Sequence, residues 1–365
     1  MMMSDLPADL VEEILSRVPA TSLKRLRSTC KEYWNSTLFK EPRFTEKHFR
    51  QAPKQFRVLM WKDCRVYPMN IDLNVIPPSI ELKGALDLKY SLRNSEQLDI
   101  AEVFHCDGLL LCFTKDNRLV VCNPCLGETR LIQHENSYKY STFALGYENN
   151  KSVRNYKILM YWECWEKNDK VSGFEIYDFS SNTWRASNAP NWVRARFGGV
   201  TLKGNSYWIT RGDGDNLLRF DFTKERFGRL CLPPSHNHGY KSPSVVREEK
   251  LSVLQHNFDT LKIEIWVTNK FETEADLLWS KSFTVGLHLH NSSIPPFRSL
   301  LIDEEKKVIL CCDSSCYWER MNVVYIIGED DGYYKKIPYK QDPCWPSINK
   351  VPCIFNYVPS LVQIQ

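Results

Sequence analysis

The amino-acid sequence predicts a mainly β protein in which a small N-terminal unit of three helices precedes a β-propeller. Residues 7–19 are amphipathic with a helical period. From Phe56 onward, short strand-like runs are broken by glycine, proline, asparagine and aspartate. These runs recur every 43 to 59 residues, a spacing typical of propeller blades. Six blades fit the chain, and five or seven are the alternatives.

The first helix is expected between Pro7 and Pro19, because proline suits the first turn of a helix but ends one further along. At about 100° per residue, the apolar side chains between them fall within an arc of roughly 140°. These side chains are Leu10, Val11, Ile14, Leu15 and Val18. A second helix should begin at Thr21, and a third should carry Tyr33, Trp34 and Leu38.

Three short helices bury too little surface to be stable alone. They therefore either form a cap packed on the main domain or form a docking module that completes its core on another protein. The periodicity is compatible with both interpretations. Residues 41–55 then supply a linking helix, with Pro42 in its first turn, and a linker. The expected domains are residues 1–40, 41–55 and 56–365.

The predicted blades share a pattern in which a strand leads through a turn to a second strand bearing arginine, tryptophan or tyrosine. Equivalent positions on the leading strands are Cys122, Tyr177, Phe220, Trp266 and Tyr325, and residues 65–69 form an earlier, weaker candidate. The tail, residues 353–364, is predicted to be a last strand pair that closes the ring by joining the first blade. Closure would leave no sheet edge open.

Composition restricts the class of protein. Aromatic residues make up 13% of the chain, which suits a body of strands. The net charge of +4 arises within residues 1–57, so no basic face for nucleic acid is expected. The chain shows neither a secretory signal nor a membrane span. Thirteen cysteines in a chain without such a signal are expected to be reduced thiols. The protein is therefore expected in the nucleus, the cytoplasm or both.

The sequence contains candidate metal ligands but no complete set. Cys122 and Cys125 have the spacing of a zinc or redox pair, yet no second such pair exists to complete four ligands. The pairs His236/His238 and His288/His290 likewise lack a third ligand. We therefore expect buried thiols and surface histidines, with no metal and no cofactor.

The N-terminal residues also resemble a known module. Leu6-Pro7, Leu10, Glu13-Ile14-Leu15, Val18-Pro19-Ala20, Leu23, Leu26-Arg27, Cys30-Lys31 and Trp34 match the order and spacing of an F-box. The remainder resembles the kelch-like, type-one F-box-associated domain of plants. The residues that carry this second resemblance are His105-Cys106-Asp107-Gly108, Asn123-Pro124, Gly146-Tyr147, Tyr156-Lys157-Ile158, residues 204–208 and residues 357–362.

The resemblance implies a non-catalytic, substrate-recognition subunit of a Skp–cullin–F-box ubiquitin ligase. The F-box would bind a Skp-type adaptor, and through it cullin, by the residues Leu6, Pro7, Leu10, Ile14, Leu15, Val18 and Leu23. The propeller would bind a protein target for ubiquitination. The alternatives are a glycan-binding or glycan-acting propeller, and an F-box scaffold that acts outside a ligase.

Target binding is expected in loops on one rim of the propeller, because loops on a rigid scaffold commonly carry recognition residues. The segments 162–170, 188–196, 211–216 and 236–241 contain side chains of the types enriched at binding hot spots. The candidates are Trp162, Trp165, Trp192, Arg194, Arg211, His236 and Tyr240. The alternative for the three tryptophans is that they pack between blades.

Overall fold

The computed structural model describes residues 6–29, 41–75, 78–89, 97–134, 141–149, 153–166, 169–190, 192–193, 198–210, 215–234, 239–269, 277–286, 299–312, 323–329, 334–338 and 352–364. The helices are α1 (Ala8–Ser16), α2 (Ala20–Thr29) and α4 (Pro42–Gln51). The predicted first, second and linking helices are therefore present. The predicted third helix, with Tyr33, Trp34 and Leu38, lies outside the described residues.

The strands form six four-stranded antiparallel sheets, so the predicted six-bladed propeller is confirmed. The strands of each blade are named in order from the innermost strand outward. Blade 1 contains β24 (Cys353–Tyr357), β1 (Arg57–Lys62), β2 (Arg65–Asp72) and β3 (Ser79–Leu82). Blade 2 contains β4 (Ile100–Cys106), β5 (Leu109–Thr114), β6 (Leu119–Asn123) and β7 (Glu128–Ile132). Blade 3 contains β8 (Ser141–Glu148), β9 (Asn155–Glu166), β10 (Asp169–Asp178) and β11 (Thr183–Asn188).

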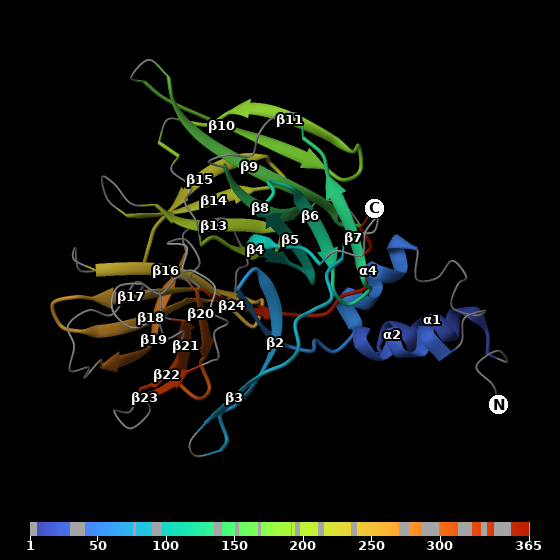
Figure 1. The fold of residues 1–365 in the computed structure, drawn as a ribbon, viewed down its shortest axis with the longest axis horizontal. Helices are drawn as coiled ribbons and strands as arrows, with labels where there is room; N and C mark the ends of the chain where they lie inside the picture. The colour runs from blue at the N-terminus through green and yellow to red at the C-terminus, as the bar shows by residue number, and fades with distance from the viewer. Residues whose placement is uncertain are drawn as a thin grey trace.

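The other blades continue around the ring, which Figure 1 shows from the side. Blade 4 contains β12 (Val200–Leu202), β13 (Asn205–Thr210), β14 (Asn216–Asp221) and β15 (Arg226–Leu230). Blade 5 contains β16 (Gly239–Val246), β17 (Lys250–Asn257), β18 (Lys262–Thr268) and β19 (Trp279–Gly286). Blade 6 contains β20 (Leu300–Asp303), β21 (Val308–Cys312), β22 (Val323–Gly328) and β23 (Tyr334–Pro338).

The two ends of the propeller sequence share blade 1. β24 pairs with β1 in antiparallel register, with Met60 opposite Ile354 and Trp61 opposite Cys353. The predicted ring closure by the tail is therefore confirmed for residues 353–357. The expected strand over residues 361–364 is wrong, because this segment is not part of any β-strand. Pro359 lacks the N–H that a ladder needs, and Asn123 instead binds the carbonyls of Ser360 and Val362.

The sequence repeat marks the third strand of every blade. Its equivalent positions fall on β6, β10, β14, β18 and β22, and the weaker candidate at residues 65–69 falls on β2. In blades 2, 3 and 4, the last residue of this strand is Asn123, Asp178 or Asp221, whose side-chain oxygen accepts backbone N–H groups of the following turn. Such a turn brings the fourth strand back alongside the third.

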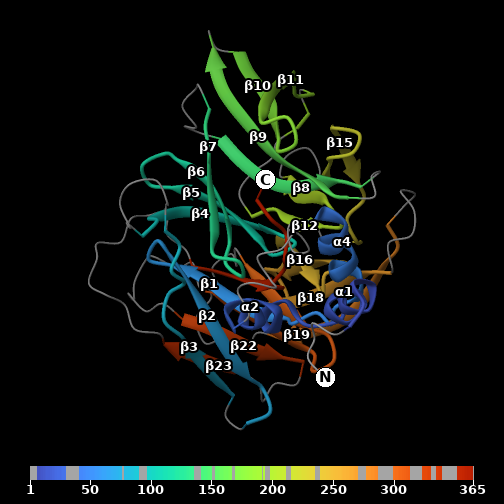
Figure 2. The ribbon, with the colours of Figure 1, turned by 90° about the vertical axis from the view of Figure 1, so that its right-hand side faces the viewer.

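The helices cover one end of the propeller, which we call the helix-side face. Phe44, Leu15 and Leu23 are each 1% exposed and pack against Cys125 and Leu361 of the propeller. Figure 2 shows α1, α2 and α4 in front of the blades. Burying a side chain such as Phe44 contributes about 1.5–3 kcal/mol. The helices are thus packed on the main domain, as one of the two interpretations proposed.

The connections alternate between the two ends of the ring. In blades 2 to 6, the turn between the first and second strands lies on the helix-side face, where Arg154 and Glu248 contact Glu46 and Lys54. The connections at the end of the propeller away from the helices are then of two kinds. They join the second strand of a blade to the third, or one blade to the next. We call that end the opposite face.

Candidate functional site

The helix α1 divides its apolar residues between two faces. Val11 and Leu15 point into the cluster beneath the helices, whereas Leu10 is 45% exposed and Ile14 is 41% exposed. In α2, Leu23 is buried in the same cluster and Leu26 is 38% exposed. We call Leu10, Ile14 and Leu26 the exposed apolar set. Leu10 and Ile14 lie one turn apart on α1 and Leu26 lies on α2, and large apolar side chains left exposed on a small helical unit mark a candidate protein-binding surface.

The linking helix α4 fixes the orientation of α1. Ser16 Oγ donates a 2.6 Å hydrogen bond to Gln51 Oε1. Lys47 Nζ lies 2.9 Å from a carboxylate oxygen of Glu12 and 2.9 Å from one of Glu13. These two carboxylates raise the pKa of Lys47, and the hydrogen bond from Lys47 is the largest cause that lowers the pKa of Glu13. Because α4 holds the inner face, Leu10 and Ile14 point outward.

The structure separates the seven predicted adaptor-binding residues into three groups. Pro7, Leu10 and Ile14 are exposed. Leu6 and Val18 are partly buried at the edge of the cluster, and Leu15 and Leu23 lie inside it. The predicted adaptor-binding residues did not include Leu26, although its position three residues after Leu23 was a usable signal. That these residues bind an adaptor stays a prediction.

A charged cluster joins α4 to the propeller. The Arg154 guanidinium lies 3.4 Å from Glu46 Oε2 and 3.5 Å from Asp107 Oδ2, and it stacks 3.7 Å from the centre of the Phe49 ring. Burial raises the pKa of Asp107 to about 6, despite the neighbouring positive charge of Arg154. Removing one partner of such a buried pair leaves an uncompensated charge. The helices and the propeller are therefore coupled by charge as well as by apolar packing.

The predicted target-binding segments all adjoin the opposite face. They follow β9, β11 and β13 or precede β16, whose relevant ends lie away from the helices. Trp162 is partly buried against the core between blades 2 and 3, which agrees with the alternative of inter-blade packing. Trp192 is 36% exposed, and the Arg229 guanidinium stacks 4.4 Å from its ring centre. Tyr240 is partly buried against the core cluster between blades 5 and 6.

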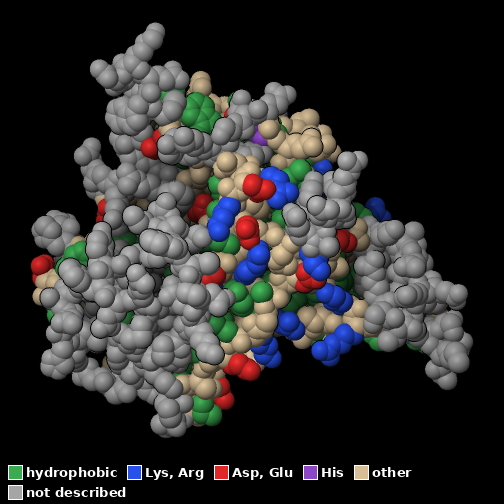
Figure 3. All heavy atoms as spheres, in the orientation of Figure 1, with side chains coloured by type: hydrophobic (Ala, Val, Ile, Leu, Met, Phe, Trp, Pro, Cys, Tyr) green, Lys and Arg blue, Asp and Glu red, His purple; other side chains and the backbone are tan. Residues whose placement is uncertain are grey.

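The remaining target-binding candidates cannot be placed. Arg194, Arg211 and His236 lie outside the described residues, as does the side chain of Trp165. Sequence reasoning missed Arg229, because an arginine within a strand carries no signal of the tryptophan it will stack on. Over the described surface in Figure 3, Lys and Arg side chains are interspersed with Asp and Glu.

The cysteine pair does not form a common site. Cys122 belongs to the core between blades 1 and 2, whereas Cys125 lies under the helices. Burial raises the pKa of Cys125. The pKa of Cys122 is raised chiefly by the neighbouring Cys112 thiol and, after that, by burial. The nine cysteines whose side chains are described are free thiols. Among the described residues, no three His, Cys, Asp or Glu side chains are grouped to hold a metal. His238, His288 and His290 lie outside the described residues.

Comparison with known proteins agrees with this two-part architecture. Residues 3–33 match the model of the F-box domain, and residues 57–364 match the model of the F-box associated beta propeller domain. The chain belongs to the F-box associated beta propeller family. A protein of Arabidopsis thaliana named F-box only protein 9 is 52% identical, over 100% of this chain and 96% of the relative. An F-box/kelch-repeat protein of Arabidopsis thaliana is 53% identical, over 100% of this chain and 98% of the relative.

Solved structures add little to this assignment. TolB from Acinetobacter baumannii overlaps with a TM-score of 0.44 at 10% identity, covering 82% of this chain and 66% of that chain. That likeness is too low to bear on fold or function. None of the described helices has the length and apolar character needed to cross a membrane.

The residues that carry the family resemblance meet one another in the F-box associated propeller. Gly108 has φ +80°, and a Cβ there would lie 2.6 Å from both Ser360 Oγ and the Val358 carbonyl oxygen. In the same way, the Tyr147 N–H donates to the carbonyl of Gly204, and a Cβ on Gly204 would lie 2.8 Å from Tyr147. These motifs therefore join blades to each other and to the tail, and they build the scaffold.

Proposed function

We propose that this F-box protein is the non-catalytic, substrate-recognition subunit of a Skp–cullin–F-box ubiquitin ligase. The observation that carries the proposal is the exposed apolar set, which lies on α1 and α2 although neighbouring leucines are buried. Leu10, Ile14 and Leu26 each leave 38–45% of their surface exposed, which forfeits less than half of the about 1.5–3 kcal/mol that full burial of such a side chain contributes. A Skp-type adaptor that covers them would recover this energy. The family membership supports the same partner.

Target recognition is assigned to the opposite face of the propeller. Because the helices cover the helix-side face, an adaptor on α1 and a target on the opposite face would not compete for space. The ligase then works by proximity, since a held target meets the ubiquitin-conjugating enzyme at high effective concentration. Free thiols throughout the described body support a location in the nucleus or cytoplasm.

Adaptor binding is tested by placing charges in the exposed apolar set. The double variant Leu10→Asp with Ile14→Asp should lose most of the binding to a Skp-type adaptor, because an unpaired buried charge costs several kcal/mol. The matched control is Phe258→Asp with Leu261→Asp, which changes two exposed apolar residues on a turn of the opposite face. Pull-down of the adaptor from both variants, with melting curves to verify folding, gives the answer. Wild-type capture by the folded Leu10/Ile14 variant would refute the proposal.

The structure also favours this double variant over removal of the helices. Deleting residues 1–40 would expose Cys125 and Leu361, which α1 and α2 cover in the intact chain. Affinity purification with the proteasome blocked should therefore compare the wild type with the Leu10/Ile14 variant. Targets should be captured by both proteins, and cullin by the wild type only. Cullin in neither sample would favour an F-box scaffold outside a ligase.

A further inference from the structure

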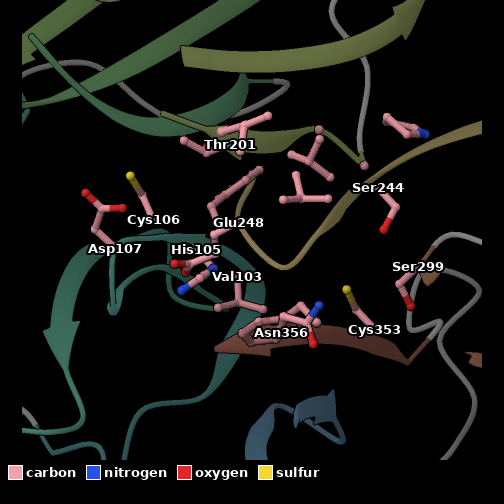
Figure 4. Close-up of a pocket in the computed structure, with 18 of the residues that line it drawn as sticks. Val103, His105, Cys106, Asp107, Thr201, Ser244, Glu248, Ser299, Cys353 and Asn356 are labelled. Carbon is pink, nitrogen blue, oxygen red and sulfur yellow. The ribbon is translucent and has the colours of Figure 1, made fainter. Parts of the chain in front are cut away.

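A cavity of about 690 Å³ runs along the axis of the propeller. Its lining includes the innermost strands β4, β12, β16, β20 and β24, each from a different blade. Figure 4 shows Val103 and His105 of β4 facing Glu248, with Ser299, Cys353 and Asn356 around the same space. Cavities of roughly 300–1,000 Å³ with mainly apolar walls are typical of small-molecule sites. We call this cavity the axial channel.

The helix side supplies the floor of the axial channel. Phe49 of α4 and Lys54, which follows α4, both line the cavity. Lys54 Nζ lies 3.2 Å from Glu248 Oε2, and Arg154 stacks on Phe49. The lining continues to Ala101, Gly199 and Ser299, which stand at the opposite-face ends of β4, β12 and β20. A molecule in the axial channel would therefore touch both the linking segment and the blades.

The charges of the lining disfavour an anionic ligand. Lys54 is paired with Glu248, and Arg154 is shared by Glu46 and Asp107. Lys203, the remaining described lysine of the lining, also has a partner. A phosphate or carboxylate would thus have to break an existing ion pair before it gained one. Most hydroxyls are occupied as well, since Ser244 donates to the Leu300 carbonyl and Thr201 to the Leu145 carbonyl.

Two polar side chains of the lining remain available. The Asn356 side chain makes no hydrogen bond to any described residue, so its amide can both donate and accept. His105 Nε2 accepts a 3.4 Å hydrogen bond from the Gly108 N–H, which leaves the proton on Nδ1. Burial lowers the pKa of His105, so the ring is a neutral donor. The apolar walls between them include Val103, Val200 and Leu300.

We propose that the axial channel binds an uncharged, mainly apolar small molecule that carries a carbonyl or hydroxyl oxygen. That oxygen accepts a hydrogen bond from His105 Nδ1 or from the Asn356 amide, while the apolar part contacts the valine and leucine walls. An extended peptide fits less well, because each residue would bury an N–H and a carbonyl that this lining cannot pair. The proposal rests on the cavity and does not depend on the proposed ligase function.

The test uses the full chain and two dyes of different charge. Nile red is uncharged, is mainly apolar and carries a carbonyl, whereas 1-anilinonaphthalene-8-sulfonate is an anion. Fluorescence titration should show about one equivalent of Nile red, with the anion bound at least about tenfold more weakly. Equal affinity for the two dyes would overturn the assigned ligand class.

Variants locate the bound dye. Val103→Trp fills the axial channel and should weaken Nile red binding by about tenfold or more. The matched control, Val75→Trp, makes the same change at an exposed residue outside the lining and should leave binding unchanged. Asn356→Leu removes the amide at similar size and should weaken binding by a smaller factor.

Ala101→Leu provides a smaller obstruction that decides the question if Val103→Trp does not fold. Melting curves and circular dichroism establish which variants are folded. Wild-type Nile red affinity in folded Val103→Trp, or in folded Ala101→Leu where the former does not fold, would place the dye elsewhere. The axial channel would then hold water only.

Discussion

The indole N–H of Trp184 donates a 2.7 Å hydrogen bond to the carbonyl oxygen of Gln133, and so links blade 3 to blade 2. Trp279 makes the equivalent 2.9 Å bond to Cys231 between blades 5 and 4. Both tryptophans stand at the start of the outermost strand of their blade. These two tryptophans of the sequence repeat thus tie neighbouring blades together at the periphery of the ring.

We expect Trp184→Phe and Trp279→Phe each to lower the stability of the protein by about 1 kcal/mol, because each leaves a carbonyl without its donor. The melting temperature should fall by roughly 2 °C for each variant. Trp192→Phe is the control, since the Trp192 ring stacks with Arg229 and a phenyl ring retains that contact. An equal loss in all three variants would assign the effect to ring size.

Asn123 should be among the most sensitive polar residues of the propeller. It donates to the carbonyls of Ser360 and Val362 and accepts from the N–H groups of Cys125 and Leu126. Asn123→Ala should cost at least about 3 kcal/mol, because these buried groups lose their partners together. Asn257→Ala is the comparison, since Asn257 caps a turn in the same way but does not hold the tail. Denaturant titration of both variants measures the difference.

Deletion of residues 353–365 should abolish cooperative unfolding of the propeller. The deletion removes β24, the innermost strand of blade 1, and exposes the paired edge of β1. It also removes Leu361 from beneath the helices. Thermal unfolding and limited proteolysis compare this chain with one that lacks Gln365 alone. A melting curve identical to that of the wild type would show that the ring closes by other contacts.

His48 should make the helices less stable in acid. It is buried with Nε2 2.7 Å from the Val18 carbonyl oxygen, and burial lowers its pKa below the ordinary value of 6.5. The unfolded chain therefore takes up a proton at a higher pH than the folded chain does. The contribution of His48 to the stability is fully present above the pKa that His48 has in the unfolded chain. It is lost as the pH falls from there through the lowered pKa of the folded state.

His48→Gln keeps a donor for the Val18 carbonyl but does not titrate. The drop in melting temperature between about pH 7.5 and about pH 5.5 should therefore be smaller in this variant than in the wild type. His105, His256 and Asp107 titrate in both proteins, so their contributions cancel in the comparison. Parallel pH profiles for the two proteins would exclude His48 as the source.

Target capture should depend on the opposite face. Trp192→Ala combined with Tyr240→Ala should reduce the proteins recovered with the full chain when the proteasome is blocked, because aromatic anchors commonly dominate binding energy. Adaptor recovery should not change. Phe56→Ala removes an exposed ring beside β1, on the helix-side face, and serves as the control. Undiminished target capture by the double variant would show that Trp192 and Tyr240 do not bind the target, and that other loops of the opposite face should be tested.

The repeat was predictable because each third strand carries its own local signals. Tyr67, Cys122 and Tyr177 sit in short strand-like runs, and the residues that build the turn follow directly in the chain. Ring closure was predictable in part for the same reason, since residues 353–357 have strand character. The end of the tail was not, because its hydrogen bonds go to Asn123, more than two hundred positions earlier.

The candidate adaptor surface was only partly predictable. Leu15 and Ile14 are neighbours in the same amphipathic arc, yet the first is buried and the second exposed. The boundary between them is set by Phe44, Cys125 and Leu361, and the last two come from distant parts of the chain. A helical period shows that one side of α1 is apolar. It does not show how much of that side another part of the same chain will cover.

The participation of Leu361 in the cluster beneath α1 has a consequence for biosynthesis. A ribosome makes the helices well before Leu361, so the nascent helices lack this support until the tail of the propeller has been synthesised. A chain that ends early would lack β24 and Leu361 together. The support beneath the N-terminal helices is thereby tied to synthesis of the same tail that completes blade 1.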